Sequence, residues 1–258
     1  MVLADVSIGV AGTLGPEAIA TLAPAVERAG FHGLWVNDLP GGDSLAALHA
    51  AAPVTERLAL GTGVVPVDRR DAASILAASS GLPAPRLRIG IGSGASRSPL
   101  GDVGAAIDEL RAGTGAAVYV GALGPRMRLL AAERADGILL NWLTSAVAAR
   151  QADEAHALAP QKHVALYVRT AVHEDAVPRL AQEADRYSGY PSYKANFDRL
   201  GIRALDTTLD PATFAGRIAA YRDAVDEVVL RVITVGDTLD EHLDFVDRAA
   251  ELLRDQPG

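Results

Sequence analysis

Apolar runs with strand character alternate with helical stretches along the whole chain, and this alternation constrains the fold more than any other feature. Eight runs rich in Val, Ile and Leu are expected to form strands, at residues 6–10, 33–38, 58–67, 87–92, 116–121, 136–141, 163–172 and 227–233. A helical stretch follows each run, always in the same order. Strands that are apolar on both faces are typical of a parallel sheet covered by helices.

Eight strand–helix units close naturally into a (β/α)8 TIM barrel, which usually has about 250 residues. The chain has 258 residues, so we predict one barrel domain over residues 1–258. A doubly wound open sheet is the competing architecture, because GVAGTLG at 9–15 and Asn37-Asp38 resemble parts of a dinucleotide-binding pattern. The glycine spacing does not match G-x-G-x-x-G there or in GIGSG at 90–94, and we therefore favour the barrel.

The composition argues against several classes of protein and partner. The chain has no cysteine, which excludes disulfides, thiolate nucleophiles and metal sites built on cysteine. Its net charge of −8 argues against nucleic acid or an anionic membrane as the main partner. The first ten residues lack a secretory pattern, and no apolar run approaches the roughly 20 residues that span a bilayer. We therefore expect a cytoplasmic protein that acts on a small molecule.

In a barrel, ligands bind at the loops that follow the carboxyl ends of the strands. In this chain those loops are rich in Gly and Asn and poor in histidines and paired carboxylates. Only His173 of the six histidines falls near that rim, and no Ser lies in a G-x-S-x-G elbow. We predict no metal site and no hydrolase chemistry. A site made mostly of backbone is typical of an enzyme whose cofactor carries the reaction.

The stretch VYVGALGPRM at 118–127 is the best candidate for binding an anionic group. Its glycines allow close approach of the backbone, and the helix that Pro125 begins directs unpaired N–H groups toward the preceding loop. An ordinary strand-to-helix corner explains the same residues, because Pro is common at the first position of a helix. The residues by themselves favour neither anion binding nor an ordinary corner over the other.

Several segments together resemble the luciferase-like monooxygenase family, in particular its branch of oxidoreductases that depend on the deazaflavin coenzyme F420. These segments occur in the family's order and span most of the chain, and the run at 118–144 is the most specific. They are AGFHGLWVND (29–38), ERLALGTGVVPVDRRDAASIL (56–76), LRIGIGSG (87–94), VYVGALGPRMRLLAAERADGILLNWLT (118–144), LYVRTAV (166–172) and RYSGYPSYKANFDRLGI (186–202).

The resemblance implies a luciferase-like barrel that binds F420 or, alternatively, FMN at its mouth. The third strand of family members often carries a bulge with a non-proline cis peptide behind the cofactor ring, and Asp38 matches an acidic position after the second strand. Asp38 is thus the candidate catalytic residue, although it could equally cap the following turn. The implied cofactor residues are Gly121, Ala122, Leu123, Gly124, Pro125 and Arg126 at the phosphate, Gly61, Thr62, Gly63 and Val64 at the bulge, and Gly92, Ser93, Asn141 and Trp142.

The chain departs from the family pattern at three places. Leu39 follows Asp38 where the family commonly has a histidine, and Ser145-Ala146 stand where Pro-Glu is usual. Only a short loop and helix at 93–115 occupy the interval between the fourth and fifth strands, where the family has a long insertion over the site. We therefore expect a shortened member with a more open cleft.

The resemblance predicts an oxidoreductase that transfers a hydride between F420 and an unidentified small organic substrate. The alternatives are an FMN-dependent luciferase-like monooxygenase or reductase, and a non-catalytic flavin-binding relative. Because F420 carries an anionic oligoglutamate tail, exposed arginines near the phosphate would favour it, and the candidates are Arg69, Arg70, Arg97 and Arg126. Tyr167 and Arg169 could face the same pocket. A homodimer is expected because the family tends to dimerise.

Overall fold

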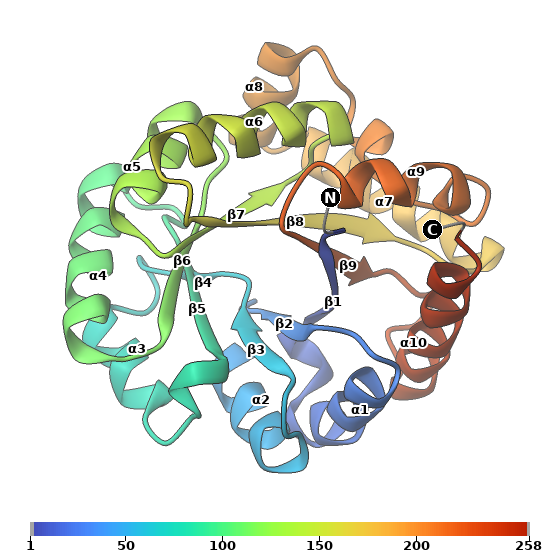
Figure 1. Cartoon of the computed structure of the whole chain (residues 1–258), viewed down its shortest axis with the longest axis horizontal. Coiled ribbons are helices and arrows are strands. Elements are labelled where there is room, and N and C mark those ends of the chain that lie inside the picture. The colour runs from blue at the N-terminus through green and yellow to red at the C-terminus, as the bar shows by residue number, and fades with distance from the viewer. Residues whose placement is uncertain (1–2, 257–258) are drawn as a thin grey trace.

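Parallel strands form a closed barrel at the centre of the molecule, and helices surround it (Figure 1). The computed structural model describes residues 3–256, so the two residues at each end of the predicted domain lie outside the described part. Neighbouring strands follow the order β3-β2-β1-β9-β8-β7-β6-β5-β4, and an additional pairing between β3 and β5 closes the ring. Closure confirms the (β/α)8 barrel and excludes the open sheet.

The strands agree closely with the eight apolar runs of the sequence. The third run is divided in two by the Gly63–Val64 peptide, which is cis, and both pieces pair with β5. This is the region in which the family resemblance implied a cis peptide. The strands are β1 (Asp5–Ala11), β2 (Gly33–Asn37), β3 (Ala59–Thr62), β4 (Val65–Pro66), β5 (Leu87–Gly92), β6 (Ala117–Gly121), β7 (Gly137–Asn141), β8 (His163–Thr170) and β9 (Glu227–Val232).

The helices begin at residues whose chemistry suits a helix N-terminus. Asp43 caps α2 by accepting hydrogen bonds from two backbone amides, and Thr238 forms a capping box with Glu241 at the start of α10. The helices are α1 (Pro16–Arg28), α2 (Ser44–Ala51), α3 (Ala72–Ser79), α4 (Pro99–Gly113), α5 (Pro125–Arg134), α6 (Ser145–Leu158), α7 (Val177–Ser188), α8 (Pro191–Leu200), α9 (Phe214–Arg222) and α10 (Leu239–Arg254).

The interval between β8 and β9 is the longest between consecutive strands and holds α7, α8 and α9. The interval between β5 and β6 holds only α4 and a short loop, as the sequence indicated. In Figure 1, α8 projects beyond the ring that the other helices form. Residues of both intervals reach the barrel mouth, among them Ser93, Gly94 and Pro99 from the β5–β6 interval and one face of α8.

The interior of the barrel is plugged by large side chains and one buried carboxylate. Trp35, Tyr119 and Tyr167 pack edge to face, with ring centroids 5.5 Å apart for Trp35 and Tyr119 and 6.3 Å for Trp35 and Tyr167. The Glu227 side chain is fully buried and accepts hydrogen bonds from the Trp35 indole at 2.7 Å and from the Arg88 guanidinium. The barrel is therefore a packed core, and a ligand has room only at its ends.

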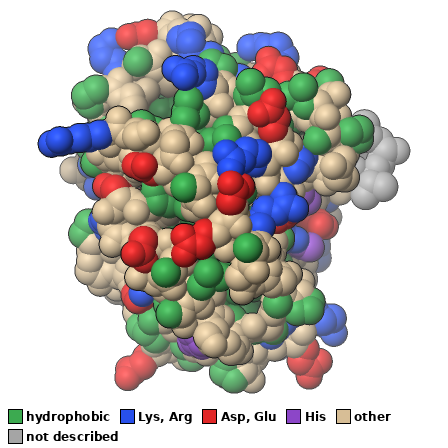
Figure 2. Space-filling view, turned by 90° about the vertical axis from the view of Figure 1, so that its left-hand side faces the viewer, with side chains coloured by type: hydrophobic (Ala, Val, Ile, Leu, Met, Phe, Trp, Pro, Cys, Tyr) green, Lys and Arg blue, Asp and Glu red, His purple; other side chains and the backbone are tan. Residues whose placement is uncertain are grey.

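The outer surface carries mixed charge. Figure 2 shows the face over α3, α4 and α5, where acidic, basic and apolar side chains are intermingled. No helix of the described chain is long and apolar enough to cross a membrane.

Candidate functional site

A cavity of about 780 Å³ opens at the mouth of the barrel, between the carboxyl ends of the strands and one face of α8. This volume falls within the range of small-molecule and cofactor sites. The residues that the resemblance implied converge here from β2, the cis peptide, β5, β6 and β7. Those that line the cavity are Asp38, Gly63, Val64, Gly92, Ser93, Gly121, Ala122, Leu123, Gly124 and Asn141.

Two implied residues of the third strand lie behind the cavity wall. A side chain on Gly61 would overlap the Trp35 ring in the barrel interior, so this position serves close packing. Thr62 is fully buried, and its hydroxyl donates a hydrogen bond of 2.9 Å to the Gly90 carbonyl. Neither Gly61 nor Thr62 is among the lining residues, and their cofactor contacts stay a prediction.

Gly121 to Gly124 form the wall of the cavity directly before α5. Gly124 is the N-cap, no side chain caps this helix, and Pro125 occupies its first turn. The first amides of a helix have no partner within the helix, and together with the helix dipole they favour an anion. Pro125 and Arg126 are exposed and do not line the cavity, so the first turn contributes only Met127 and the loop before it supplies Gly121 to Gly124.

The available space differs between the two glycines of this loop. A Cβ on Gly121 would lie 3.0 Å from the Val64 side chain, whereas a Cβ on Gly124 would meet nothing within 4 Å. Gly121 therefore allows β6 to pack against the cis peptide. Gly124 borders open space at the helix N-terminus, which is the space a phosphate needs.

Two buried side chains beside the cis peptide each have a polar atom without a hydrogen-bond partner. Asn37 donates its side-chain N–H to the Gly63 carbonyl, and its own Oδ1 is buried without a partner. The Tyr167 hydroxyl also lacks a partner, and a Cβ on Gly63 would overlap it. Burial raises the pKa of Tyr167 well above its usual value, so its hydroxyl stays a neutral donor.

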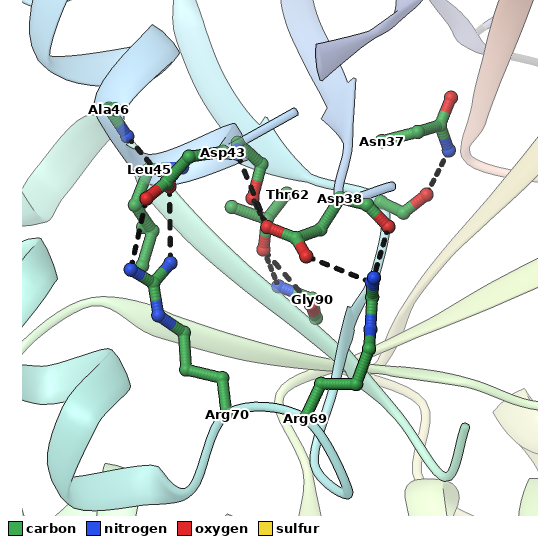
Figure 3. Close-up of polar contacts among 11 residues, drawn as sticks. Asn37, Asp38, Asp43, Leu45, Ala46, Thr62, Arg69, Arg70 and Gly90 are labelled. Carbon is green, nitrogen blue, oxygen red and sulfur yellow. Dashed lines mark hydrogen bonds and ion pairs between the residues drawn. The ribbon is translucent and has the colours of Figure 1, made fainter. Parts of the chain in front are cut away.

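Asp38 lines the cavity but is also engaged in the surrounding loops (Figure 3). Its Oδ1 pairs with Arg69 at 3.0 Å, and its Oδ2 accepts hydrogen bonds from the Ser44 backbone amide and hydroxyl at 3.2 and 3.0 Å. The neighbouring Arg70 pairs in the same way with Asp43. Both oxygens of Asp38 thus act as acceptors in a structural network.

Arg169 forms the side of the cavity at the ends of β7 and β8. Its guanidinium lies against two neighbouring rings, 4.1 Å from the Trp142 centroid and 4.9 Å from that of Tyr187. It also donates to Asn141 Oδ1 and, at 3.1 Å, to Glu183. Trp142 is 1% exposed and does not line the cavity, because Arg169 and Tyr187 cover it.

Glu183 of α7 balances the positive charge at this side of the cavity. Burial alone raises the pKa of its carboxyl, but the guanidinium groups of Arg169 and Arg231 outweigh this effect and lower the pKa below its ordinary value. Burial in turn lowers the pKa of Arg231, which Glu183 opposes. The three side chains form one coupled ionic group.

The face of α8 that lines the cavity was not predicted from the sequence. It presents Ser192, Tyr193, Asn196 and Arg199 together with Ala195. The spacing of Ser192, Asn196 and Arg199 places them on one side of a helix, which the sequence could have indicated. What the spacing does not show is that this side packs over the barrel mouth.

Other parts of the rim contribute no reactive group. His173 pairs with Asp244 of α10 at 2.6 Å and does not line the cavity. Within residues 3–256 no group of three His, Asp or Glu side chains could hold a metal ion. Leu39, which stands where the family commonly has a histidine, does line the cavity.

Comparison with known sequences supports the family resemblance. A sequence model of the family described as luciferase-like monooxygenase matches residues 2–117. This part includes the cis peptide and the implied residues of β5, but it ends before the loop at Gly121. The resemblance is thus confirmed in the first part of the chain, where the chain carries the sequence pattern of luciferase-like monooxygenases. No curated protein matches the chain significantly.

Solved structures extend the likeness to the fold of the whole described chain. The F420-dependent tetrahydromethanopterin reductase of Methanopyrus kandleri is 17% identical with a TM-score of 0.67, over 97% of this chain and 98% of that one. An F420-dependent secondary alcohol dehydrogenase with an F420-acetone adduct is 14% identical with a TM-score of 0.76, over 98% and 100%. The oxygenating constituent of 3,6-diketocamphane monooxygenase from Pseudomonas putida, with FMN, is 12% identical with a TM-score of 0.61, over 97% of each chain.

Proposed function

We propose that this protein is an oxidoreductase that transfers a hydride between coenzyme F420 and a small organic substrate. The observation that carries the proposal is the cavity at the barrel mouth, in which the uncapped N-terminus of α5 and the cis peptide face one space. Two of the solved structures with this fold are of enzymes described as F420-dependent.

The residues of the cavity fit a deazaflavin or flavin. The loop from Gly121 to Gly124 offers backbone amides and open space to a phosphate. The buried Asn37 Oδ1 and the Tyr167 hydroxyl lack partners beside the cis peptide and can bond to the polar edge of a ring. When bound, F420 supplies the hydride or accepts it.

The residues of this chain would bind and orient the reactants rather than react with them. The neutral Tyr167 hydroxyl is a donor at an oxygen or nitrogen of a bound ring, because its high pKa keeps the proton in place. Asp38 positions the loop before α2 through its contacts with Arg69 and Ser44. We therefore assign Asp38 a positioning role in place of the catalytic role that the resemblance implied.

Four arginines were candidates for binding the anionic tail that F420 has, and only two of them are free of ion pairs among residues 3–256. Arg69 and Arg70, which were candidates for the anionic tail of F420, are paired with Asp38 and Asp43. Within the described chain Arg97 and Arg126 are exposed and form no ion pair. These two remain available to an anionic tail that leaves the cavity at the α5 side.

An FMN-dependent oxygenase or reductase is the second candidate. It is favoured by the FMN in the solved structure of the diketocamphane monooxygenase constituent, which has the same fold. A non-catalytic flavin-binding protein would need the same cavity and phosphate site. Cofactor titration separates these candidates more directly than the fold does.

Titration of the purified protein with F420 and, separately, with FMN tests the proposal. We expect F420 fluorescence to be quenched on binding with a micromolar or lower dissociation constant, and FMN to bind more weakly. A preference for FMN would favour the second candidate. Absence of micromolar binding to either cofactor would contradict both enzymatic functions.

A further inference from the structure

The α8 face of the cavity carries polar groups that neither the fold nor the cofactor site uses. Asn196 is only 5% exposed, it lines the cavity, and its Nδ2 has no hydrogen-bond partner. An amide N–H that is buried without an acceptor is destabilising, and most such groups in proteins are satisfied. This donor is therefore placed to bond with an acceptor that enters the cavity.

Arg199 determines which end of the Asn196 amide is free. Its guanidinium donates to Asn196 Oδ1. Because Arg has only donors, it can bond to the oxygen end of the amide but not to the nitrogen end. The N–H donors of Asn196 are thus left as the unpaired end, and the Arg199 charge lies beside them.

The charge of Arg199 is not neutralised within the described chain. Arg199 forms no ion pair in residues 3–256, whereas Lys194 on the same helix pairs with Asp198 at 2.7 Å. Glu183, a buried carboxylate on the neighbouring helix α7, is paired with Arg169 and Arg186. A ligand at this end of the cavity therefore meets an uncompensated cation and a free amide donor.

The surrounding residues define the chemistry of the ligand. Ser192 adds a hydroxyl one turn before Asn196 on the same face of α8. Tyr187 and Tyr193 line the adjacent wall with their rings 4.9 Å apart. A planar group with two acceptor oxygens can accept hydrogen bonds from both the arginine and the amide. An apolar body attached to that group can pack against the two rings.

We propose that Ser192, Asn196 and Arg199 form a carboxylate-binding subsite, with the apolar part of the ligand against Tyr187 and Tyr193. The proposal deepens the proposed function, since it takes the same cavity as the reaction site. The carboxylate has two sources, either an organic acid substrate or the oligoglutamate tail of F420.

Calorimetric titration of the protein without cofactor tests the subsite, with benzoate as the probe and benzamide as its uncharged counterpart. We expect benzoate to bind more tightly than benzamide. Arg199→Gln should weaken benzoate binding by about 10- to 100-fold, the loss of one charge-assisted hydrogen bond, and should leave benzamide unchanged. Lys194→Gln, on the same helix but outside the cavity lining, is the matched control and should change neither.

Asn196→Asp is a second variant that keeps the size of the side chain. Its carboxylate would pair with Arg199 and repel an incoming anion, so benzoate binding should be lost while the melting temperature changes little. Equal affinity of the wild type for benzoate and benzamide, no benzoate binding, or unchanged binding in Arg199→Gln would each overturn the subsite.

A third comparison distinguishes the sources of the carboxylate. F420 with its glutamate tail and F420 without it are titrated into the wild type and Arg199→Gln. If the tail occupies the subsite, only the tailed form loses affinity in the variant; if a substrate does, neither form changes. If F420 does not bind the wild type at all, the proposed function fails, and the benzoate titration still decides the subsite.

Discussion

The Arg169 guanidinium joins three elements at the edge of the cavity. It stacks on Trp142 after β7, contacts Tyr187 of α7 and pairs with Glu183 of the same helix. Arg169 is 5% exposed, so its charge depends on these partners rather than on water. Because Arg169 lies over the Trp142 ring, Trp142 packs behind the cavity wall and does not form part of the cavity surface.

The Glu183 carboxylate is expected to make the stability of the fold depend on pH. Because the folded pKa of Glu183 lies below its ordinary value of 4.5, its stabilising effect is present above that value and is lost as the pH falls through the folded pKa. Glu183→Gln should lower the free energy of unfolding at neutral pH by about 3 kcal/mol. Below pH 4.5, the free energy of unfolding should also decrease less steeply with falling pH in the variant than in the wild type.

Denaturant unfolding of both proteins at several pH values measures this effect. Glu251→Gln, which removes an exposed partner of Arg248, is the control and should change stability by less than about 1 kcal/mol. Parallel stability–pH curves for the wild type and Glu183→Gln would show that Glu183 does not carry the predicted linkage.

At the scale of elements, the loop between β6 and α5 lines the cavity through Gly121 to Gly124. Gly124 has an extended backbone that any residue adopts, and its side is open to the cavity. Gly121 instead packs against Val64 of the cis peptide, so a side chain there would disturb the wall as well as the loop. Gly124 is therefore the position at which ligand binding can be probed without altering the packing.

Gly124→Val should weaken the binding of F420 or FMN by more than about tenfold, because its side chain fills the space before the helix N-terminus. The free energy of unfolding should fall by no more than about 1 kcal/mol, because Val is a poorer N-cap than Gly. Gly216→Val is the matched control, since a Cβ on Gly216 of α9 also meets nothing within 4 Å and lies outside the cavity. Unchanged cofactor affinity in Gly124→Val would mean that the loop is only a corner.

At the scale of the whole molecule, the barrel separates the end that holds a buried polar network from the end that carries the cavity. Glu227, at the start of β9, accepts hydrogen bonds from Ser7, Trp35 and Arg88 on three other strands. The cavity lies at the opposite, carboxyl ends of the strands. The interior network thus serves closure of the barrel, while the loops and α8 form the cavity.

Glu227→Ala should reduce the free energy of unfolding by about 3–5 kcal/mol, because it leaves the Arg88 guanidinium without its buried partner. Urea unfolding followed by circular dichroism measures the change, with exposed Glu109→Gln as the control. A loss below about 1 kcal/mol would contradict the assigned role. At urea concentrations where the variant is still folded, cofactor affinity should equal that of the wild type.

The strands could be predicted because their apolar runs are local signals, and all eight matched. The sequence placed the loop from Gly121 to Gly124 after the fifth of these strands, where it lines the cavity, and its binding of a phosphate stays a prediction. The position of the cis peptide came from the family resemblance rather than from a residue pattern. The subsite on α8 could not be predicted, since the helical spacing of Ser192, Asn196 and Arg199 does not show which surface they face. Arg69 and Arg70 looked available for an anion, but Asp38 and Asp43 approach them across separate loops.

The sequence by itself determined the barrel, because the order and period of its apolar runs admit few other ways to bury them. It also determined that the carboxyl ends of the strands carry glycine and asparagine rather than reactive pairs. Only the tertiary structure decided which polar groups are neutralised and which are left free. Pairing depends on distances between segments far apart in the chain, and thus Asp38 is engaged while Asn196 and Arg199 face the cavity.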